Sequence, residues 1–239
     1  MEERFSRTEM LIGKEGLERL KNARVAVFGI GGVGGYAVEA LARSGIGTLD
    51  LIDRDVVSVS NINRQIIALT STIGRYKAEV ASERARDINP DIKVNVYNIF
   101  YTPETADIFD FGSYDYIIDA IDTVTGKIEL VMQADRTGTP IISSMGAGNK
   151  LNPALFEVSD IYKTSVSPLA RVMRRELKCR SIKKLKVVYS KEPPFEQRKK
   201  EYDSEAKKII PASIAFVPSV AGLIIAGEVI KDIAGINMY

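Results

Sequence analysis

Residues 25–35 read VAVFGIGGVGG, an apolar run followed by five glycines in seven positions. The apolar run indicates a buried strand, and the glycines match the pattern G-x-G-x-x-G at Gly29, Gly31 and Gly34. Glycines at this spacing permit a tight turn and let an anionic group approach the N-terminus of the next helix. The stretch therefore predicts a strand, a nucleotide-binding loop and a helix, which is how a doubly wound α/β fold begins.

The alternation of strand and helix continues through the first 145 residues. Short runs rich in β-branched or aromatic residues predict strands, and the longer segments between them have the apolar periodicity of helices. Helices that connect successive strands are the crossovers that a parallel sheet requires. We therefore expect an α/β fold, with a doubly wound, Rossmann-like mixed sheet and helices on both of its faces. The predicted strands are residues 25–28, 48–52, 92–97, 116–119 and 141–144, and the predicted helices are residues 33–43, 75–88 and 124–136.

The length of 239 residues, 45% of them hydrophobic, is enough for one sizeable core. We expect a single domain over residues 1–239, with a nucleotide-binding core in 1–146 and an extension of the same domain in 147–239. Two further strands are predicted in the extension, at residues 155–158 and 185–189, and they flank a basic helix. Residues 191–208 are charged and contain prolines, so we expect an exposed, flexible crossing loop there.

Residues 209–227, IIPASIAFVPSVAGLIIAG, carry no charge and are long enough to cross a membrane. Pro211 and Pro218 favour a different interpretation, a buried strand at residues 212–217 and a helix that begins near Pro218. Membrane association through residues 209–227 is the alternative. No apolar region follows a basic N-terminus and one cysteine provides no disulfide framework, so we expect a cytoplasmic protein.

The chain contains no histidine and a single cysteine, Cys179. This composition excludes the commonest general base, the histidine-activated nucleophiles and the histidine metal sites. A zinc site built from four thiolates is excluded as well, so we expect no zinc. A basic environment lowers the pKa of a thiol, which leaves a catalytic Cys179 as an alternative, although a lone cysteine near a helix end is more often incidental.

Positive charge is concentrated in residues 171–191, where nine Lys or Arg accompany one Glu, a local net charge of +8 against +2 for the chain. On a helix that begins near Pro168, the spacing i, i+3, i+4, i+7 places four of these residues on one face, and Arg180, Lys183, Lys184 and Lys186 extend the run. A solvated helix face is one interpretation, and a surface that follows the phosphates of a polyanion is the other. The candidate phosphate contacts are Arg171, Arg174, Arg175, Lys178, Lys183 and Lys184.

Asp53 follows Gly34 by 19 residues, at the end of the second predicted strand. A carboxylate at this point accepts hydrogen bonds from ribose hydroxyls, and with the glycine pattern alone it favours NAD. The polar residues that follow favour ATP, because a departing pyrophosphate needs cations and a divalent metal. Asp122 follows the fourth predicted strand, at the edge of the sheet where ligands bind, and is suited to Mg²⁺. The other residues of this set are Asp55, Asn61, Arg64 and Lys77.

Several motifs recur in order: GIGGVGGYAVEALARSGIGTLDLIDRDVV, SNINRQ, the G-x-x-K of Gly74 to Lys77, and DAID at residues 119–122. With these motifs the chain resembles the adenylate-forming enzymes related to ubiquitin-activating proteins. The resemblance implies that the glycine loop approaches ATP, that Asp53 binds ribose, and that Asp122 is the metal-binding and catalytic carboxylate. It also implies a homodimer in which an N-terminal arginine, Arg7 or else Arg4, reaches the ATP of the partner. The remaining implied nucleotide contacts are Gly29, Gly31, Gly32, Gly34, Asp55, Asn61, Arg64 and Lys77.

Four further segments resemble one branch of this family, whose members modify tRNA: RFSRTEMLIG, DINP, TPET, and GAG-x-x-x-x-P at residues 146–153. That branch uses ATP to adenylate the threonine carboxylate of N6-threonylcarbamoyladenosine and closes this nucleoside to its cyclic form. The resemblance implies tRNA, and no DNA, as the partner, and it assigns the basic residues to tRNA phosphates. An ionised carboxylate attacks without a general base, which accounts for the absence of histidine.

Three other functions stay open at this level. The nearest is an adenylyltransferase that activates the C-terminus of a sulfur-carrier or ubiquitin-like protein, with a sulfur-relay protein as a further partner. Such enzymes often carry paired C-x-x-C motifs, which a chain with one cysteine lacks. The second is an NAD-dependent oxidoreductase, which the glycine pattern alone allows. The third is a tRNA-binding scaffold without catalysis.

Overall fold

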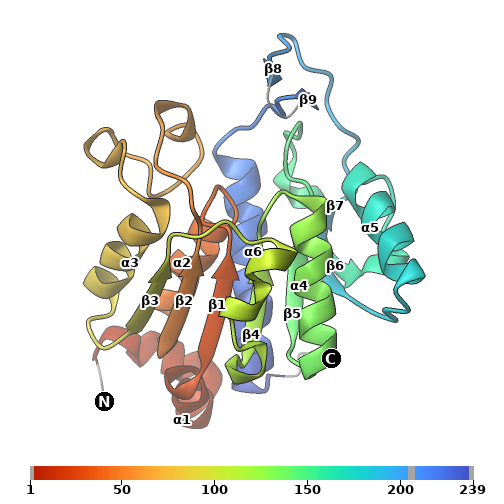
Figure 1. Cartoon of the computed structure of the whole chain (residues 1–239). Helices are drawn as coiled ribbons and strands as arrows, with labels where there is room; N and C mark the ends of the chain where they lie inside the picture. The colour runs from red at the N-terminus through yellow and green to blue at the C-terminus, as the bar shows by residue number, and fades with distance from the viewer. Residues whose placement is uncertain (1–2, 204–207, 237–239) are drawn as a thin grey trace.

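The structure, a computed structural model, describes residues 3–203 and 208–236. Its centre is a seven-stranded sheet in the order β3-β2-β1-β4-β5-β7-β6, in which all neighbouring strands are parallel except the antiparallel pair β6 and β7 (Figure 1). The predicted doubly wound, mixed α/β sheet is confirmed. The strands are β1 (Arg24–Phe28), β2 (Thr48–Ile52), β3 (Lys93–Tyr97), β4 (Tyr116–Asp119), β5 (Ile141–Ser144), β6 (Phe156–Asp160) and β7 (Lys186–Ser190).

Helices cover both faces of the sheet because alternate residues of each strand point to opposite sides. In β1, Val25 and Val27 join the core under α2, α3 and α6, whereas Ala26 and Phe28 join an aromatic core on the side of α4. A third apolar cluster lies between α4, α5 and β7. The helices are α1 (Ser6–Asn22), α2 (Gly34–Arg43), α3 (Lys77–Ile88), α4 (Val124–Thr137), α5 (Pro168–Cys179) and α6 (Phe216–Ala234).

Short 3-10 helices shape several of the connections. On the α4 side, Phe109 directly follows η4 and Phe111 begins η5, and their rings pack at edge-on and stacked angles against Phe28. These segments are η1 (Glu3–Phe5), η2 (Val59–Asn61), η3 (Thr70–Thr72), η4 (Pro103–Ile108), η5 (Phe111–Ser113), η6 (Pro153–Leu155) and η7 (Ile161–Lys163).

The predicted strand at residues 212–217 is wrong. The backbone of Ala212 bonds to Asn149 instead of to a strand, and α6 begins at Phe216, whose side chain is largely exposed. Pro218 lies in the first turn of α6, where a helix tolerates proline. Within the part of the chain that the structure describes, no helix is long and apolar enough to cross a membrane.

The charged crossing segment is held at several points where it is described. Phe195 donates its backbone N–H to the carbonyl of Asn149, and the side chain of Gln197 donates to Asn149 Oδ1 and to the Ile210 carbonyl. Two short strands, β8 (Tyr202–Asp203) and β9 (Lys208–Ile209), pair antiparallel. Residues 204–207, also part of the predicted flexible loop, lie outside the described residues.

Candidate active site

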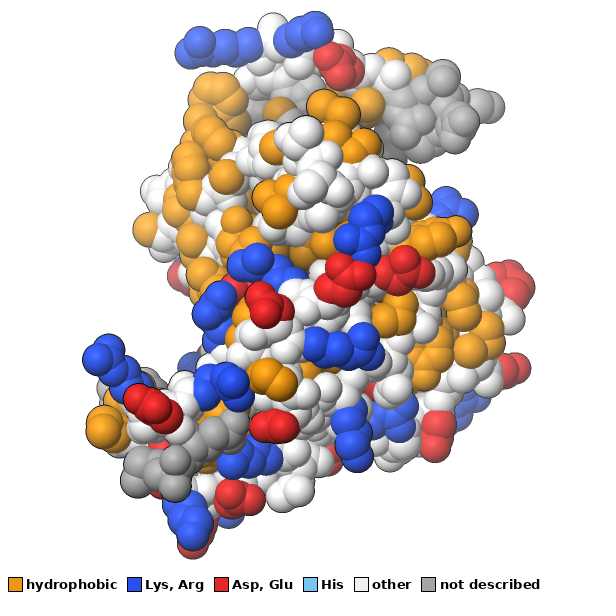
Figure 2. Space-filling model, turned by 90° about the vertical axis from the view of Figure 1, so that its left-hand side faces the viewer, with side chains coloured by type: hydrophobic (Ala, Val, Ile, Leu, Met, Phe, Trp, Pro, Cys, Tyr) orange, Lys and Arg blue, Asp and Glu red, His pale blue; other side chains and the backbone are white. Residues whose placement is uncertain are grey.

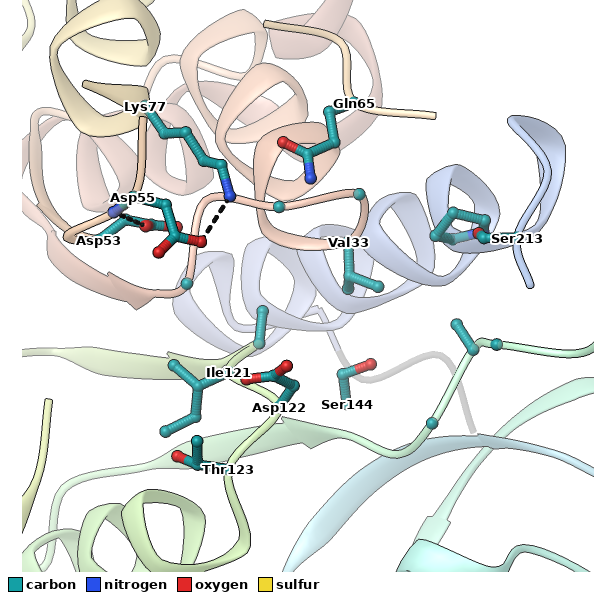
Figure 3. A pocket seen from close by; sticks show the side chains of 18 of the residues that line it. Val33, Asp53, Asp55, Gln65, Lys77, Ile121, Asp122, Thr123, Ser144 and Ser213 are labelled. Atoms are coloured by element: carbon teal, nitrogen blue, oxygen red, sulfur yellow. Dashed lines mark hydrogen bonds and ion pairs between the residues drawn. The ribbon is translucent and has the colours of Figure 1, made fainter. Parts of the chain in front are cut away.

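A cavity of about 650 Å³ opens at the carboxyl ends of the parallel strands. The order of the sheet reverses between β1 and β4, so the loops after these strands separate and leave a crevice, the usual ligand site of open α/β sheets. Figure 3 shows this cavity, with the glycine loop and Lys77 on one side and Asp122 on the other. The cavity is lined by residues from 29–33, 52–55, 61–65, 77, 99–101, 120–123, 144–148, 210–213 and 218, and by Leu169 at the start of α5.

The glycine loop has the shape that its sequence predicts. Gly29 has φ of 90°, and a Cβ there would lie 2.7 Å from the carbonyl oxygen of Ala120. A Cβ at Gly34 would lie 1.8 Å from the carbonyl oxygen of Gly29, so only glycine allows the turn to close. Gly31 and Gly32 line the cavity. A ligand can therefore approach their backbone at the start of α2.

Asp53 is fixed by two backbone donors beside this loop. Its carboxylate accepts from Ile30 N at 2.7 Å and from Asp55 N at 2.8 Å. Burial raises the pKa of Asp53 above its ordinary value, while the charge of Lys77 and these two N–H groups act in the opposite direction. The carboxylate is thereby held in one orientation at the cavity wall, as an acceptor for hydroxyl groups requires.

Two cations and an amide line the cavity together with Asp53. The ammonium of Lys77 lies 2.8 Å from the Asp55 carboxylate and points into the cavity (Figure 3). Arg64 donates to the Ser60 carbonyl and to Asn63 Oδ1, and burial lowers its pKa. Asn61 is buried, and its Oδ1 accepts from Ser58 N, which closes the turn that carries Arg64. The fold thus gathers Asp53, Asp55, Asn61, Arg64 and Lys77, which the sequence spreads over 25 positions, around one cavity.

Asp122 lies on the other wall, in the loop between β4 and α4. Its side chain is exposed and lines the cavity next to Thr123 and Ser144 (Figure 3). Within residues 3–203 and 208–236, no three His, Cys, Asp or Glu side chains form a metal cage. One carboxylate facing a phosphate-sized space suits Mg²⁺, because this ion typically uses one or two protein carboxylates together with substrate phosphates and water.

Arg7 is not part of this cavity. It is exposed on α1, and the preceding Phe5 packs against Gly45, in the loop that enters β2 at the opposite end of the sheet. Figure 1 shows α1 at the bottom of the molecule, whereas the cavity lies at the top of the strands. Arg7 therefore does not reach the cavity of its own chain.

The basic residues around α5 divide into two groups. Arg174 is half-buried and donates to the carbonyl and hydroxyl of Thr164, and Arg175 pairs with Glu176 at 2.9 Å. The other candidates are exposed and, among the described residues, make no ion pair: Arg171, Lys178, Lys183 and Lys184. Cys179 is exposed at the end of α5 and does not line the cavity.

Two lining residues escaped the sequence-based prediction. Gln65 is 7% exposed, and its Oε1 atom has no hydrogen-bond partner within the described structure. Tyr101 is 3% exposed, and its hydroxyl is also without a partner among the described residues. Gln65 is the last residue of the motif SNINRQ, and its neighbour Arg64 was predicted as a site residue. The position of Gln65 in this motif was therefore the signal that could have identified it. Tyr101 directly precedes the segment TPET but is not part of it, so no motif pointed to Tyr101 itself.

Comparison with known proteins gives one consistent picture. The sequence model of the ThiF family matches residues 5–239. The tRNA threonylcarbamoyladenosine dehydratase of Bacillus subtilis (strain 168) is 49% identical over 96% of this chain and 94% of that protein. The enzyme of the same name from Escherichia coli (strain K12) is 44% identical over 74% of this chain and 66% of its own length. The crystal structure of the E. coli enzyme in complex with ATP matches with a TM-score of 0.88 at 36% identity, over 97% of this chain and 94% of that one.

Proposed function

The chain belongs to the ThiF family, and from this we propose that it is an ATP-dependent dehydratase that converts N6-threonylcarbamoyladenosine in tRNA to the cyclic nucleoside. The observation that carries the proposal is the cavity, in which the carboxylates of Asp53 and Asp122 and the cations of Arg64 and Lys77 meet at the switch point of the sheet, as the binding of Mg²⁺-ATP would require. The identity of 49% to a dehydratase over nearly the whole length of both chains supports the choice of substrate.

The reaction begins with the adenylation of a carboxylate. An oxygen of the threonine carboxylate forms a bond to the α-phosphorus of ATP while the bond from this phosphorus to the pyrophosphate oxygen breaks. The product is an acyl-adenylate. Because the attacking oxygen already carries charge, the chain needs to provide position and positive charge and no general base.

Ring closure then uses a group that the substrate carries. The carbamoyl group attacks the activated acyl carbon, AMP leaves with one of the former carboxylate oxygens, and the proton of the attacking group passes to water. The nucleoside loses one water overall, and ATP is converted to AMP and pyrophosphate. No thioester with the enzyme is formed, which agrees with the position of Cys179 outside the cavity.

The scheme assigns a role to seven residues of the cavity. Asp53 accepts from the ribose hydroxyls, and Gly31 and Gly32 let the phosphates approach the start of α2. Arg64 and Lys77 stabilise the departing pyrophosphate, and Asn61 holds the turn that carries Arg64. Asp122 holds Mg²⁺, which when bound neutralises part of the phosphate charge.

We place tRNA on the exposed cations around α5. Leu169 lines the cavity, so the first turn of α5 is adjacent to it, and Arg171 follows two residues later with its side chain exposed. Lys178, Lys183 and Lys184 continue the positive surface away from the cavity. Phosphate contacts at these positions would orient the tRNA while its modified nucleoside enters the cavity. Because tRNA is the substrate, we assign the reaction to the cytoplasm.

We further propose that the active form is a homodimer. Arg7 cannot reach its own cavity and would serve that of a second copy. Figure 2 shows hydrophobic side chains gathered on the upper part of the face that carries the loops between β2 and α3. Apolar side chains concentrated on one surface favour a protein contact, and the second copy is the partner that also accounts for Arg7. The exposed side chains of this segment are Val56, Val59, Ile62, Leu69, Ile73 and Tyr76.

The decisive test is nucleoside mass spectrometry of threonylcarbamoylated tRNA after incubation with the protein and Mg²⁺-ATP. We expect the threonylcarbamoyl nucleoside to lose the mass of one water, with one pyrophosphate released for each nucleoside converted. Pyrophosphate release that requires a protein ending in two glycines, and not tRNA, would assign the chain to carrier-protein activation. Tight binding of NADH without Mg²⁺ would assign it to the oxidoreductases.

A further inference from the structure

An ammonium group is buried behind the wall of the cavity that carries Asp122. Lys127, in the first turns of α4, is 0% exposed. Its Nζ lies 2.8 Å from the Ser144 carbonyl, 3.0 Å from Asp119 Oδ1 and 3.3 Å from Ser143 Oγ. The Ser143 hydroxyl in turn donates to Asp119 Oδ2. The three protons of the ammonium have three acceptors, so the group is fully satisfied.

Stability alone does not explain this arrangement. Taking an ammonium and a carboxylate out of water has a desolvation cost that their attraction roughly offsets, and two apolar side chains of similar volume often stabilise a fold as well. Asp119 is also 0% exposed, so neither charge contacts a ligand in the cavity. The effect of the pair must therefore lie in the geometry that it imposes on its neighbours.

The pair joins the two loops that form one wall of the cavity. Asp119 is the last residue of β4 and Ser143 and Ser144 end β5, with Asp119 and Ser143 as register partners. Beyond this point the strands stop pairing, and residues 120–123 and 144–148 separate to line the cavity. Lys127 reaches across the end of the ladder, and Asp119 Oδ1 also accepts weakly from Ile121 N. Figure 3 shows the consequence, with the side chains of Asp122 and Ser144 next to each other.

We propose that Lys127 is a positioning residue for the adenylation step. It fixes residues 120–123, which carry Asp122, relative to residues 144–148, and so sets the wall against which the substrate carboxylate is placed. The proposal rests on the proposed function. The proposal treats the wall that carries Asp122 as independent of the residues assigned to ATP binding. Asp53, Arg64 and Lys77 stand on other elements and make no hydrogen bond to the Lys127–Asp119 pair within the described structure.

This separation defines the expected phenotype. Loss of Lys127 leaves the binding of ATP intact and lowers turnover, because a displacement of about 1 Å between reacting groups costs on the order of 100-fold in rate. Lys127→Met alone leaves the Asp119 carboxylate buried without its cation and endangers folding. The informative variant is the double substitution Lys127→Met with Asp119→Asn, which removes both charges.

A matched control exists at the opposite end of the sheet. Arg24 pairs with Asp50 at 2.7 Å, and Asp50 is also 0% exposed, but neither residue lines the cavity. The double substitution Arg24→Met with Asp50→Asn removes an ion pair whose carboxylate is equally buried, although its cation is about a third exposed. Its turnover per molecule that binds ATP should stay within about threefold of wild type, whatever its effect on stability.

The test measures ATP binding and turnover on the same samples. Calorimetry gives the fraction of molecules that bind ATP and their Kd, and pyrophosphate release with threonylcarbamoylated tRNA gives kcat per binding molecule. For Lys127→Met with Asp119→Asn we expect an ATP Kd within about threefold of wild type and a kcat lower by about 100-fold. A kcat within threefold of wild type, or a Kd weakened in parallel with kcat, overturns the proposal.

A second measurement does not depend on the substrate. Backbone amides of residues 120–123 and 144–148 should exchange hydrogen faster in the Lys127→Met, Asp119→Asn protein than in wild type, while Ile30 N and Asp55 N keep their rates. Unchanged exchange in both loops overturns the proposal even if the wild-type protein does not act on tRNA. Inactivity of the wild-type protein would count against the proposed function alone.

Discussion

Lys77 Nζ lies 2.8 Å from Asp55 Oδ2, at the mouth of the cavity (Figure 3). The two partners differ in environment, since the side chain of Lys77 is 7% exposed and that of Asp55 is 57% exposed. The cation is therefore buried with its charge directed at the cavity, and water reaches its partner. An incoming phosphate competes with Asp55 for a cation that is already in place.

The first prediction follows from this asymmetry. Lys77→Ala should lower the kcat/KM for pyrophosphate release by about 100-fold, because a charge aimed at the leaving group is lost. Asp55→Asn should change it by less than about fivefold, since water reaches the Asp55 carboxylate and screens its attraction to Lys77. Steady-state kinetics of both variants checks the prediction, and equal losses would mean that Asp55 contacts the nucleotide itself.

Asp122 supports a second prediction. Asp122→Asn should reduce pyrophosphate release by about 100- to 1000-fold and shift the Mg²⁺ concentration for half-maximal rate upward, because the carboxylate charge is removed from the metal-binding wall. Asp107→Asn, an exposed aspartate outside the cavity, is the matched control and should behave as wild type. A normal Mg²⁺ titration of Asp122→Asn would contradict the assignment.

The third prediction concerns Arg7 and the second copy. Arg7→Ala and Asp122→Ala should each be nearly inactive, but a mixture of equal amounts, after exchange of subunits, should regain about a quarter of wild-type activity. Half of the dimers are then mixed, and each mixed dimer has one cavity with both residues. An inactive mixture, with subunit exchange verified by native mass spectrometry, would exclude the trans contribution.

The exposed cations near α5 give the fourth prediction. Lys183→Glu with Lys184→Glu should weaken tRNA binding and lower the slope of log Kd against log salt concentration by about 1 to 2, while ATP binding is unchanged. Lys14→Glu with Lys93→Glu changes the net charge equally at exposed positions outside the cavity. If the two double variants have the same effect, Lys183 and Lys184 act on tRNA binding only through the net charge of the protein.

The fifth prediction concerns the contribution of Glu39 to the stability of the fold at acid pH. Burial raises the pKa of Glu39, but hydrogen bonds from Arg84 and Arg43 outweigh this and hold the pKa below its ordinary value. A lowered pKa means that Glu39 stabilises the fold above the pKa of the unfolded chain, and that this contribution is lost as the pH falls through the folded pKa. The difference in unfolding free energy between wild type and Glu39→Gln should therefore shrink between about pH 6 and pH 3 in urea titrations. A difference that stays constant with pH would contradict this role.

Much of the fold was predictable because apolar periodicity decides it. The five strands predicted in the first 146 residues agree with the structure to within one residue at each end. The start of α3 was placed two residues early, because Tyr76 forms an isolated bridge with Val56 before the helix begins at Lys77. The prediction of a strand at residues 212–217 was wrong for a related reason. Their β-branched and aromatic residues favour a strand, but the backbone N–H and carbonyl of Ala212 bond to Asn149, a polar residue distant in sequence.

The candidate site was predictable where chemistry and motif coincide. Asp53, Arg64, Lys77 and Asp122 stand in recognisable segments, and the structure places all four around one cavity. Lys127 was not predictable, because a lysine in an amphipathic helix ordinarily lies in solvent and only the end of the β4–β5 ladder buries it. The location of Arg7 at the opposite end of the sheet likewise depends on tertiary structure.

The contact between Gly222 of α6 and Val33 of the glycine loop has a consequence for biosynthesis. A Cβ at Gly222 would lie 2.2 Å from the Val33 carbonyl oxygen, and Pro218 lies directly against Gly32. The last described helix therefore supports the first nucleotide-binding turn, although about 190 residues separate them. As the chain leaves the ribosome, residues 29–34 emerge long before α6, so their loop lacks its packing partner until α6 follows. Nascent chains that end before α6 should not be retained on immobilised ATP, so the ability to bind nucleotide reports that translation has passed α6.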